Sequence, residues 1–229
     1  MANYAEHHAT VTVNAPVHQV YALFSHFNDF PKFMSFVKEV TYSDDQHSHW
    51  VAEVAGRHEW DAVNENWVPD QQIGWHSTNG LDNFGKVTFQ PSGSNQTRVD
   101  VYISYDPPAG FVGDIGEKLG TGSRFESALQ NDLTHFARMV DEAPAGALDP
   151  NSSNYLFHGD SAAAKGTTTQ RQNETMYNDP NQPQHNAGTR VTTDQDITGT
   201  TNQDLATGSV NPAGPGSNPS PSDPTQTNY

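Results

Sequence analysis

The sequence predicts an α+β fold, in which a curved antiparallel sheet of about seven strands wraps around a long C-terminal helix, followed by a disordered tail. Three observations predict this organisation. Several segments of the first half alternate apolar and polar residues with a period of two, which is typical of strands half exposed to solvent. A later segment repeats apolar residues at helical spacing. Aromatic and aliphatic residues then become scarce after about residue 150.

Two short helices are expected after the first strand. Asn14 is a good N-cap residue and Pro16 is tolerated in a first helical turn, so one helix is predicted from there to Asn28. Pro31 is predicted to open a second, shorter helix. The strands, separated by turn-forming residues, are expected over 9–13, 37–42, 49–55, 58–68, 72–78, 85–90 and 98–105.

A long helix is predicted to close the domain, from about Ser123 to Asp141. Its apolar residues recur every three or four positions and so form one stripe that can cover the sheet. They are Phe125, Leu129, Leu133, Phe136 and Val140.

The composition divides the chain into a domain at residues 1–148 and a tail at 149–229. Only four of the 23 aromatic residues follow residue 150, and 51 of the last 79 residues are Thr, Asn, Ser, Gln, Gly or Pro. Such a segment buries too little apolar surface to offset an ordering cost of about 1–2 kcal/mol per residue. We therefore expect the tail to be disordered; its protein partner, if any, is unknown.

Charge and residue content exclude several classes of protein. The chain has no cysteine, so it has no disulfide, thiolate nucleophile or Cys-ligated metal. A net charge of −16 argues against nucleic acid as a partner. No apolar run approaches the ~20 residues of a membrane span, and the N-terminus does not look like a signal peptide. A cytoplasmic protein is expected.

The order strand, two short helices, six strands and long helix is the helix-grip architecture, also called START-like or Bet v 1-like. Several motifs resemble the polyketide cyclase/dehydrase and START-like lipid-transport superfamily (SRPBCC), and within it bacterial coenzyme Q-binding START-type proteins. The resemblance covers roughly residues 8–142 and implies a bacterial protein with a ligand cavity between the sheet and the last helix. The motifs are Asn14-Ala-Pro-Val-His-Gln-Val-Tyr21, Phe30-Pro-Lys-Phe-Met34, His47-Ser-His-Trp-Val51, Glu59-Trp-Asp61, Ile73-Gly-Trp75, Gly85-Lys-Val-Thr-Phe89, Tyr105-Asp-Pro-Pro-Ala-Gly110 and Leu133-Thr-His-Phe136.

The alternation of each strand selects the residues expected to line that cavity. Three tryptophans on adjacent strands could form a flat, polarizable wall for a quinone, polyketide or acyl chain. The same side chains could instead fill a solid core, and side-chain volume decides between these readings. The predicted ligand-binding residues are Trp50, Trp60, Ile73, Trp75, Phe89, Val101, Ile103, Tyr105, Phe125, Leu129 and Leu133.

The glycines at 113, 116, 120 and 122 precede the long helix. Each Gly inside a helix costs about 1 kcal/mol relative to Ala, so this segment should be poorly helical. It is either a mobile gate beside the cavity or an ordinary connecting loop.

No catalytic, metal or cofactor site is predicted. His47 and His49 share one strand face, but the histidines lack a third ligand at a defined spacing and are interpreted as surface residues. The acids Glu53, Glu59, Asp61 and Glu65 alternate on what we expect to be the outer face. Inside the cavity only Ser77 and Tyr105 are polar candidates.

Three functions remain open. The preferred one is binding or carriage of a hydrophobic small molecule, such as a lipid, a quinone or a polyketide-like compound. The second is a polyketide cyclase/dehydrase-type enzyme, which a polar residue at the base of the cavity would favour. The third is a non-catalytic interaction or stress-protection module with a filled cavity.

Overall fold

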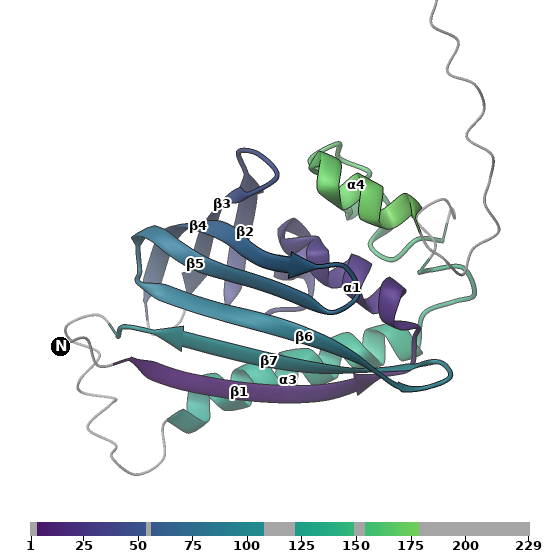
Figure 1. The fold of residues 1–229 in the computed structure, drawn as a ribbon, viewed down its shortest axis with the longest axis horizontal. Coiled ribbons are helices and arrows are strands. Elements are labelled where there is room, and N and C mark those ends of the chain that lie inside the picture. Colours follow the sequence, from purple (N-terminus) through teal and green to yellow (C-terminus); the bar gives the residue numbers. More distant parts are fainter. Residues whose placement is uncertain (1–3, 54–55, 108–121, 149–153, 179–229) are drawn as a thin grey trace, which may run out of the picture. The chain divides into compact units, whose positions relative to one another are not determined.

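The computed structural model describes residues 4–53, 56–107, 122–148 and 154–178 (Figure 1). Its strands form one curled antiparallel sheet in the order β1-β7-β6-β5-β4-β3-β2. The predicted fold class is confirmed. The strands are β1 (Ala5–Val13), β2 (Val37–Tyr42), β3 (His47–Glu53), β4 (Arg57–Val68), β5 (Gln72–Gly80), β6 (Asn83–Gly93) and β7 (Gln96–Tyr105). The helical elements are α1 (Val17–Ser25), η1 (Phe27–Lys32), α3 (Gly122–Asp141), η2 (His158–Asp160) and α4 (Gln170–Tyr177).

The sheet is a meander from β2 to β7 that β1 completes. β1 pairs with β7 along its whole length, from Ala5 opposite Tyr105 to Val13 opposite Thr97. β1 and β2 therefore lie at the two edges, and the helical insertion between them connects one edge to the other. Short turns join β2 to β3, β4 to β5, β5 to β6 and β6 to β7, as the period-two segments and intervening turn residues predicted.

The two short helices differ in detail from the prediction. α1 begins directly after Pro16, and no side chain caps it. Asn14, the predicted N-cap, instead accepts a hydrogen bond from Gln96 Nε2 at 2.7 Å, which ties the end of β1 to β7. The second helix is the 3₁₀ turn η1, and Pro31 lies inside it rather than opening it.

The long helix α3 confirms the predicted stripe. It runs along β1 and covers the inner face of the sheet (Figure 1). Leu129, Leu133 and Phe136 are fully buried, and Val140 is buried at its end. The opposite face of this helix carries exposed polar residues, so burial of one apolar stripe holds it on the sheet.

The folded unit extends beyond the predicted boundary at residue 148. Residues 154–178 form η2 and α4, and α4 packs on α1. α4 begins with a capping box, in which Thr169 Oγ1 accepts from Gln172 N and Gln172 Oε1 accepts from Thr169 N. Tyr155 and Met176 are buried against the domain. The expectation of disorder from residue 149 onward is therefore wrong for 154–178, because a few buried side chains and many specific hydrogen bonds fix this C-terminal segment.

The C-terminal segment holds the outer side of η1 and α1. Asn28 Nδ2 donates to Thr167 O at 3.0 Å, and Asp29 Oδ1 accepts from Ala162 N at 2.9 Å. Gln172 Nε2 donates to Ser25 O at 3.0 Å. These bonds attach the helical insertion to the C-terminal segment through two of its side chains and one backbone carbonyl.

Further contacts fix α4 itself at both ends. His18 lies between Asp70 and the Thr175 carbonyl, at 2.8 and 3.0 Å. The guanidinium of Arg171 stacks on Trp67, with its central carbon 5.1 Å from the ring centroid. The predicted gate at residues 111–122 falls almost entirely outside the described residues, and residues 179–229 lie outside them as well.

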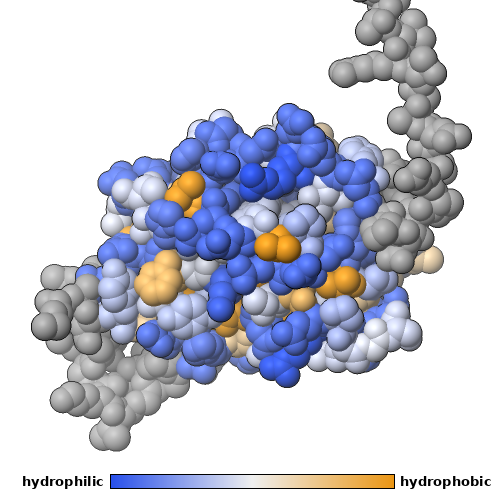
Figure 2. All heavy atoms as spheres, viewed as in Figure 1, coloured by the Kyte–Doolittle hydropathy of each residue, from blue (hydrophilic) through white to orange (hydrophobic). Residues whose placement is uncertain are grey.

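Figure 2 shows one face of the molecule, which is largely hydrophilic with isolated apolar side chains. Among the described residues, the exposed large hydrophobic side chains are Tyr4, Val68, Phe84 and Tyr177. Most apolar surface is therefore turned inward. No helix among the described residues is long and apolar enough to cross a membrane.

Candidate functional site

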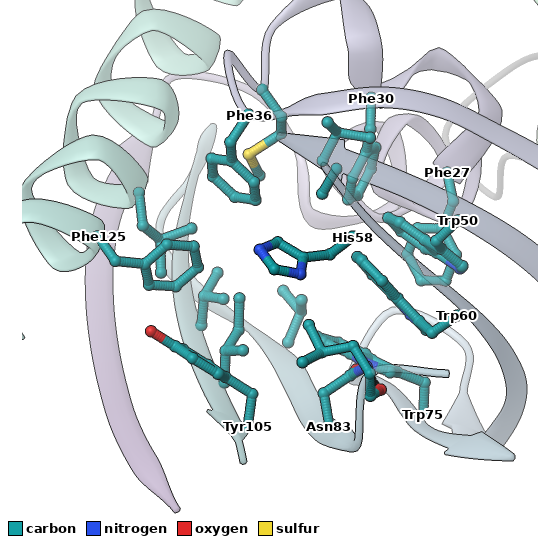
Figure 3. Close-up of a pocket in the computed structure, with 18 of the residues that line it drawn as sticks. Phe27, Phe30, Phe36, Trp50, His58, Trp60, Trp75, Asn83, Tyr105 and Phe125 are labelled. Carbon is teal, nitrogen blue, oxygen red and sulfur yellow. Dashed lines mark hydrogen bonds between the residues drawn. The ribbon is translucent and has the colours of Figure 1, made fainter. Parts of the chain in front are cut away.

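A cavity of about 100 Å³ lies between the inner face of the sheet and the first half of α3 (Figure 3). Side chains from strands β2–β7, both short helices and α3 form its wall, and nearly all of them are apolar. The lining residues are Phe24, Phe27, Phe30, Met34, Phe36, Val37, Trp50, Ala52, His58, Trp60, Trp75, Leu81, Asn83, Val87, Val101, Ile103, Tyr105, Phe125 and Leu129.

Three tryptophans from neighbouring strands form one side of the cavity. Trp50 pairs with Trp60 in the β3–β4 register, and their rings stack with centroids 5.7 Å apart and planes 11° apart. Trp75 follows on β5, where its Nε1 donates to Asn83 Oδ1 at 3.1 Å. Because alternate residues of a strand face the same way, this stack is a direct result of the period-two pattern.

Gly85 makes room for the third tryptophan. It lies opposite Trp75 in the β5–β6 register. A Cβ at this position would overlap the Trp75 ring and come within 2.6 Å of the Tyr102 carbonyl oxygen. The absence of a side chain at Gly85 therefore lets the indole of Trp75 pack directly against the backbone of β6.

Phenylalanines of η1 close a second side of the cavity. Phe27 contacts Trp50 and Trp75, with ring centroids 5.1 and 6.2 Å apart, and Phe30 contacts Trp50 at 5.9 Å. The opposite face of η1 is the one held by Asn28 and Asp29 against the C-terminal segment. η1 therefore presents apolar side chains to the cavity and is hydrogen-bonded to the C-terminal segment on its other face.

Phe125 of α3 forms the end of the cavity nearest the start of that helix. Its ring lies 4.8 Å from His7, 5.0 Å from Phe36 and 5.7 Å from Tyr105, measured between centroids. Burial raises the pKa of the Tyr105 phenol above its usual value. The phenol therefore stays protonated near neutral pH and can both donate and accept hydrogen bonds.

A few polar groups lie in this apolar wall. Figure 3 shows the imidazole of His58, on β4, projecting toward the space that the aromatic side chains enclose. Asn83 is buried and its amide is engaged, since it accepts from Trp75 and donates to Leu81 O at 2.8 Å. The indole N–H of Trp60 is buried and has no hydrogen-bond partner among the described residues.

The structure places most of the predicted site residues on the cavity wall. These are Trp50, Trp60, Trp75, Val101, Ile103, Tyr105, Phe125 and Leu129. Three predicted residues do not line it: Ile73, Phe89 and Leu133 are buried in the packed core. They face inward as predicted, but they lie where α1 fills the space between sheet and α3; for example, Phe89 contacts Tyr21 and Phe24 of α1.

The sequence interpretation missed His58 and Asn83. It treated all the histidines as surface residues, although His58 has the same parity along its strand as Trp60 and Ala62, which were expected inside. Asn83 likewise shares its strand face with Val87. Alternation therefore contained the signal for His58, whose polarity was wrongly taken as a sign of exposure, whereas Asn83 was missed because β6 begins two residues before the predicted strand. Ser77, the other polar candidate, does not line the cavity and instead accepts from Asn83 N at 2.9 Å.

The outer face of the sheet carries pairs of histidines and carboxylates. His49 contacts Asp61 at 2.8 Å and His76 contacts Glu65 at 3.1 Å, between neighbouring strands. The hydrogen bond from His49 holds the pKa of Asp61 below its usual value. Among the described residues, no group of three or more His, Cys, Asp or Glu side chains is placed to hold a metal ion.

Comparison with known proteins relates this chain to a family. Residues 13–128 match the family described as polyketide cyclase/dehydrase and lipid transport. An uncharacterized 17.2 kDa protein of Streptomyces lincolnensis is 31% identical over 135 residues, which are 58% of this chain and 87% of that protein.

Solved structures share the fold. A crystal structure from Thermus thermophilus is 21% identical with a TM-score of 0.53, covering 62% of this chain and all of that one. The Zhui aromatase/cyclase of a Streptomyces species is 17% identical with a TM-score of 0.50, covering 62% of this chain and 98% of that one. The family match spans about half of the chain, from the end of β1 into α3, and contains most of the cavity wall. The chain belongs to the polyketide cyclase/dehydrase and lipid transport family.

Proposed function

We propose that this protein binds a hydrophobic small molecule, such as a lipid, quinone or polyketide-like compound, in the cavity between the sheet and α3. The observation that carries the proposal is the wall itself: stacked tryptophans and phenylalanines surround an unfilled space inside a folded domain. Interiors are normally close-packed, so an aromatic-lined space is a ready site for an apolar guest. The family to which the chain belongs includes lipid transport.

The size of the cavity limits what it can hold without movement. Typical small-molecule sites enclose about 300–1,000 Å³, whereas this one encloses about 100 Å³. A cavity of about 150 Å³ is enough for benzene. We therefore expect the cavity to receive a single ring or a short chain segment of the ligand, and a larger ligand to require the wall to move.

The test compares the ligand content of two variants with that of the natural chain. Full-length protein is purified without detergent and analysed by native mass spectrometry, before and after extraction with organic solvent. Ala52→Leu fills the cavity, since Ala52 is part of its wall, whereas Ser127→Leu adds the same side chain on the exposed face of α3.

The expected result is a bound species of a few hundred daltons in the natural chain and in Ser127→Leu, and none in Ala52→Leu. The proposal also requires that added naphthoquinone quenches tryptophan fluorescence, or that added fatty acid changes its intensity or wavelength. A protein that is empty and does not respond to either compound would contradict it and favour the interaction-module alternative.

His58 favours a second candidate function, that of a cyclase/dehydrase-type enzyme. An imidazole inside an apolar cavity is the kind of group that can take a proton from carbon between two carbonyls and return it to oxygen. In a poly-β-ketone the resulting enolate carbon attacks a second carbonyl carbon of the same chain, whose C=O π bond opens to an alkoxide that takes the proton back from the imidazole. This closes a ring with an alcohol, and loss of water from that alcohol then gives a double bond.

A substitution at His58 separates this function from binding alone. His58→Gln keeps a polar side chain of similar length but removes the proton-transfer group. If the protein is an enzyme, a soluble β-diketone will exchange its central hydrogen with D₂O faster in the presence of the natural chain than of His58→Gln. Equal exchange rates for both proteins, at equal occupancy, would exclude this role of His58.

A further inference from the structure

The register of the strands divides the cavity wall into two layers. At one end of the sheet β3 and β7 end and β4 and β6 begin, so residues near these four strand ends lie at the same level. His58 lies opposite Ala52 there, and Tyr105 lies opposite Asn83. We call these four residues, together with Phe125 near the start of α3, the outer layer of the cavity.

A second layer of the wall lies further from those strand ends. Val87 pairs with Val101 four residues inward along β6 and β7. On α3, Leu129 lies about one turn beyond Phe125. We call Val87, Val101 and Leu129, together with Phe24 of α1, the inner layer, and all four of these side chains are buried.

The two layers differ in exposure and in polarity. In the outer layer, the side chains of His58, Tyr105 and Phe125 are partly exposed. This layer also carries an imidazole, a phenol and an amide, whereas the inner-layer side chains are hydrocarbon only. Figure 3 shows Tyr105 and Phe125 across the enclosed space from Phe27 and Trp50, so the phenol lies at one side of the cavity.

The tryptophans of the wall present carbon atoms, and not N–H groups, to a ligand. The N–H of Trp50 donates to Ser48 Oγ at 2.8 Å, and that of Trp75 donates to Asn83 Oδ1 at 3.1 Å. The N–H of Trp60 is buried so completely that a water-sized atom does not reach it. The three indoles therefore offer a ligand van der Waals contact but no hydrogen bond from nitrogen.

A polar atom of a ligand has a different free energy in the two layers. An oxygen in the inner layer loses its hydrogen bonds to water and meets only hydrocarbon, which is unfavourable. In the outer layer the same oxygen lies beside the hydrogen-bonding groups of His58 and Tyr105. A hydrocarbon segment, in contrast, is most stable in the inner layer, where the buried side chains exclude water.

We propose that the ligand is an amphiphile with a single polar end, bound with its hydrocarbon end in the inner layer and its polar end in the outer layer. This inference rests on the proposed function, since it concerns what the cavity binds. It selects among hydrophobic ligands. A fatty acid, a long-chain alcohol or an isoprenoid quinone that enters by its tail fits the two layers, and a polyketone with oxygen atoms along its whole length does not.

Two isomeric ketones test the inference. 2-Heptanone and 4-heptanone have the same composition, the same unbranched carbon chain and no charge, and differ only in whether the carbonyl lies near one end or at the centre. The full chain is expected to bind 2-heptanone about tenfold more tightly, because its carbonyl stays in the outer layer while its pentyl chain enters the inner layer. Titration of the isotope-labelled protein by NMR measures both dissociation constants.

The orientation of 2-heptanone can be measured directly, because its two terminal methyl groups have distinct proton resonances. The methyl group of the pentyl chain is expected to give nuclear Overhauser effects to the methyl protons of Val101 and Leu129. The methyl group next to the carbonyl is expected to give them to the ring protons of Tyr105 or Phe125. The opposite pattern would overturn the inference, whatever the affinities.

A hydroxyl group placed in the inner layer should weaken the selection. Val101→Thr keeps the shape of the side chain but adds a donor, so 4-heptanone gains a partner and the preference for 2-heptanone should fall to about threefold or less. Val101→Ala is the control, since it changes the shape of the same wall without adding a polar group. The preference should persist in this variant, and an equal fall in both variants would contradict the inference.

The outcomes separate this inference from the proposed function. If both ketones shift the resonances of cavity residues and bind the natural chain equally well, the cavity binds apolar molecules but does not select for a single polar end. If neither ketone shifts any resonance of a cavity residue, the proposed function fails and the inference fails with it. The comparison of the two ketones in the natural chain decides the matter even if a Val101 variant folds poorly.

Discussion

The two halves of the interface between α3 and the sheet are built from the same kinds of residue but packed differently. In the second half, Phe136 lies 4.7 Å from Phe24 and 4.9 Å from Phe33, with no exposed surface. In the first half, Phe125 and Leu129 border an unfilled space. We refer to these as the packed half and the hollow half.

The difference lies in what stands between sheet and helix. In the packed half, α1 lies against β6 and β7 and inserts Phe24 and Tyr21 between the layers. In the hollow half, α1 contributes Phe24 alone, and the side chains of η1 and of the segment after it, such as Phe27 and Phe30, form the rest of this wall. A cavity can thus arise in a helix-grip fold from ordinary apolar residues, at the place where the short helices between the sheet and α3 end.

The largest expected effect comes from truncating the packed half. Phe136→Ala should lower the free energy of unfolding by about 3–5 kcal/mol, because it removes a buried ring and leaves a hole. Phe125→Ala, on the same helix but partly exposed beside the cavity, should cost clearly less. Urea denaturation of both variants measures the difference, and equal losses would contradict the division into two halves.

Gly85 tests whether the hollow half tolerates change at its wall. Gly85→Ala should destabilise by about 1–3 kcal/mol, because the new Cβ overlaps the Trp75 ring and approaches the Tyr102 carbonyl. Gly93→Ala is the matched control on β6, where the nearest atom to a new Cβ is 3.4 Å away. Thermal unfolding and tryptophan emission together should show a loss of stability and a displaced indole only for Gly85→Ala.

A pair of alanines contrasts filled and unfilled space directly. Ala52 and Ala62 face inward on neighbouring strands and are both buried, but only Ala52 lines the cavity. Ala62→Leu should cost about 1–3 kcal/mol by overpacking, whereas Ala52→Leu should cost little because its methyl groups enter existing space. Similar unfolding midpoints for the two variants would mean that the space is not available in solution.

The smallest expected effect concerns Asp132 on α3, which accepts from Ser35 N and Oγ at 2.8 and 3.0 Å. Burial raises the pKa of this carboxyl above its usual value, in spite of these bonds. Because its pKa is higher in the folded than in the unfolded state, this carboxyl stabilises the fold when it is protonated. This contribution to the free energy of unfolding is complete below the unfolded-state pKa and is lost as the pH rises through the folded-state pKa.

Asp132→Asn keeps an acceptor for Ser35 but cannot ionise. Its stability relative to the natural chain should therefore improve between about pH 4, the ordinary carboxyl pKa, and neutrality. Denaturation curves across this range provide the measurement. If the stability of Asp132→Asn relative to the natural chain instead falls as the pH rises, the fold stabilises the charged carboxylate of Asp132.

The element order and the inward face of strands β3–β7 could be predicted from the sequence, because alternation and the α3 stripe depend on local spacing alone. The extent of the cavity could not, since it depends on how far α1 reaches. Ile73, Phe89 and Leu133 face inward in the same way as Trp75, yet they lie in the packed half. Spacing along a strand shows which way a side chain points but not what meets it there.

The C-terminal segment was missed for a different reason. Its composition is that of a disordered chain, and composition averages over single positions. The Thr169-x-x-Gln172 capping box was nevertheless visible in the sequence as a helix start. Gln172 Nε2 also donates to Ser25 O, so the side chain that completes the capping box of α4 also attaches α4 to α1. Small elements fixed by such hydrogen bonds leave little trace in average hydrophobicity.

The attachment of this segment behind η1 has a consequence for competition. Because the segment and the surface it covers belong to one chain, docking is intramolecular, and effective concentrations in such arrangements reach the millimolar range. A separate peptide with the sequence of residues 154–178 would need comparable concentrations to displace it. The C-terminal segment therefore stays attached to η1, which carries Phe27 and Phe30, however far the protein is diluted.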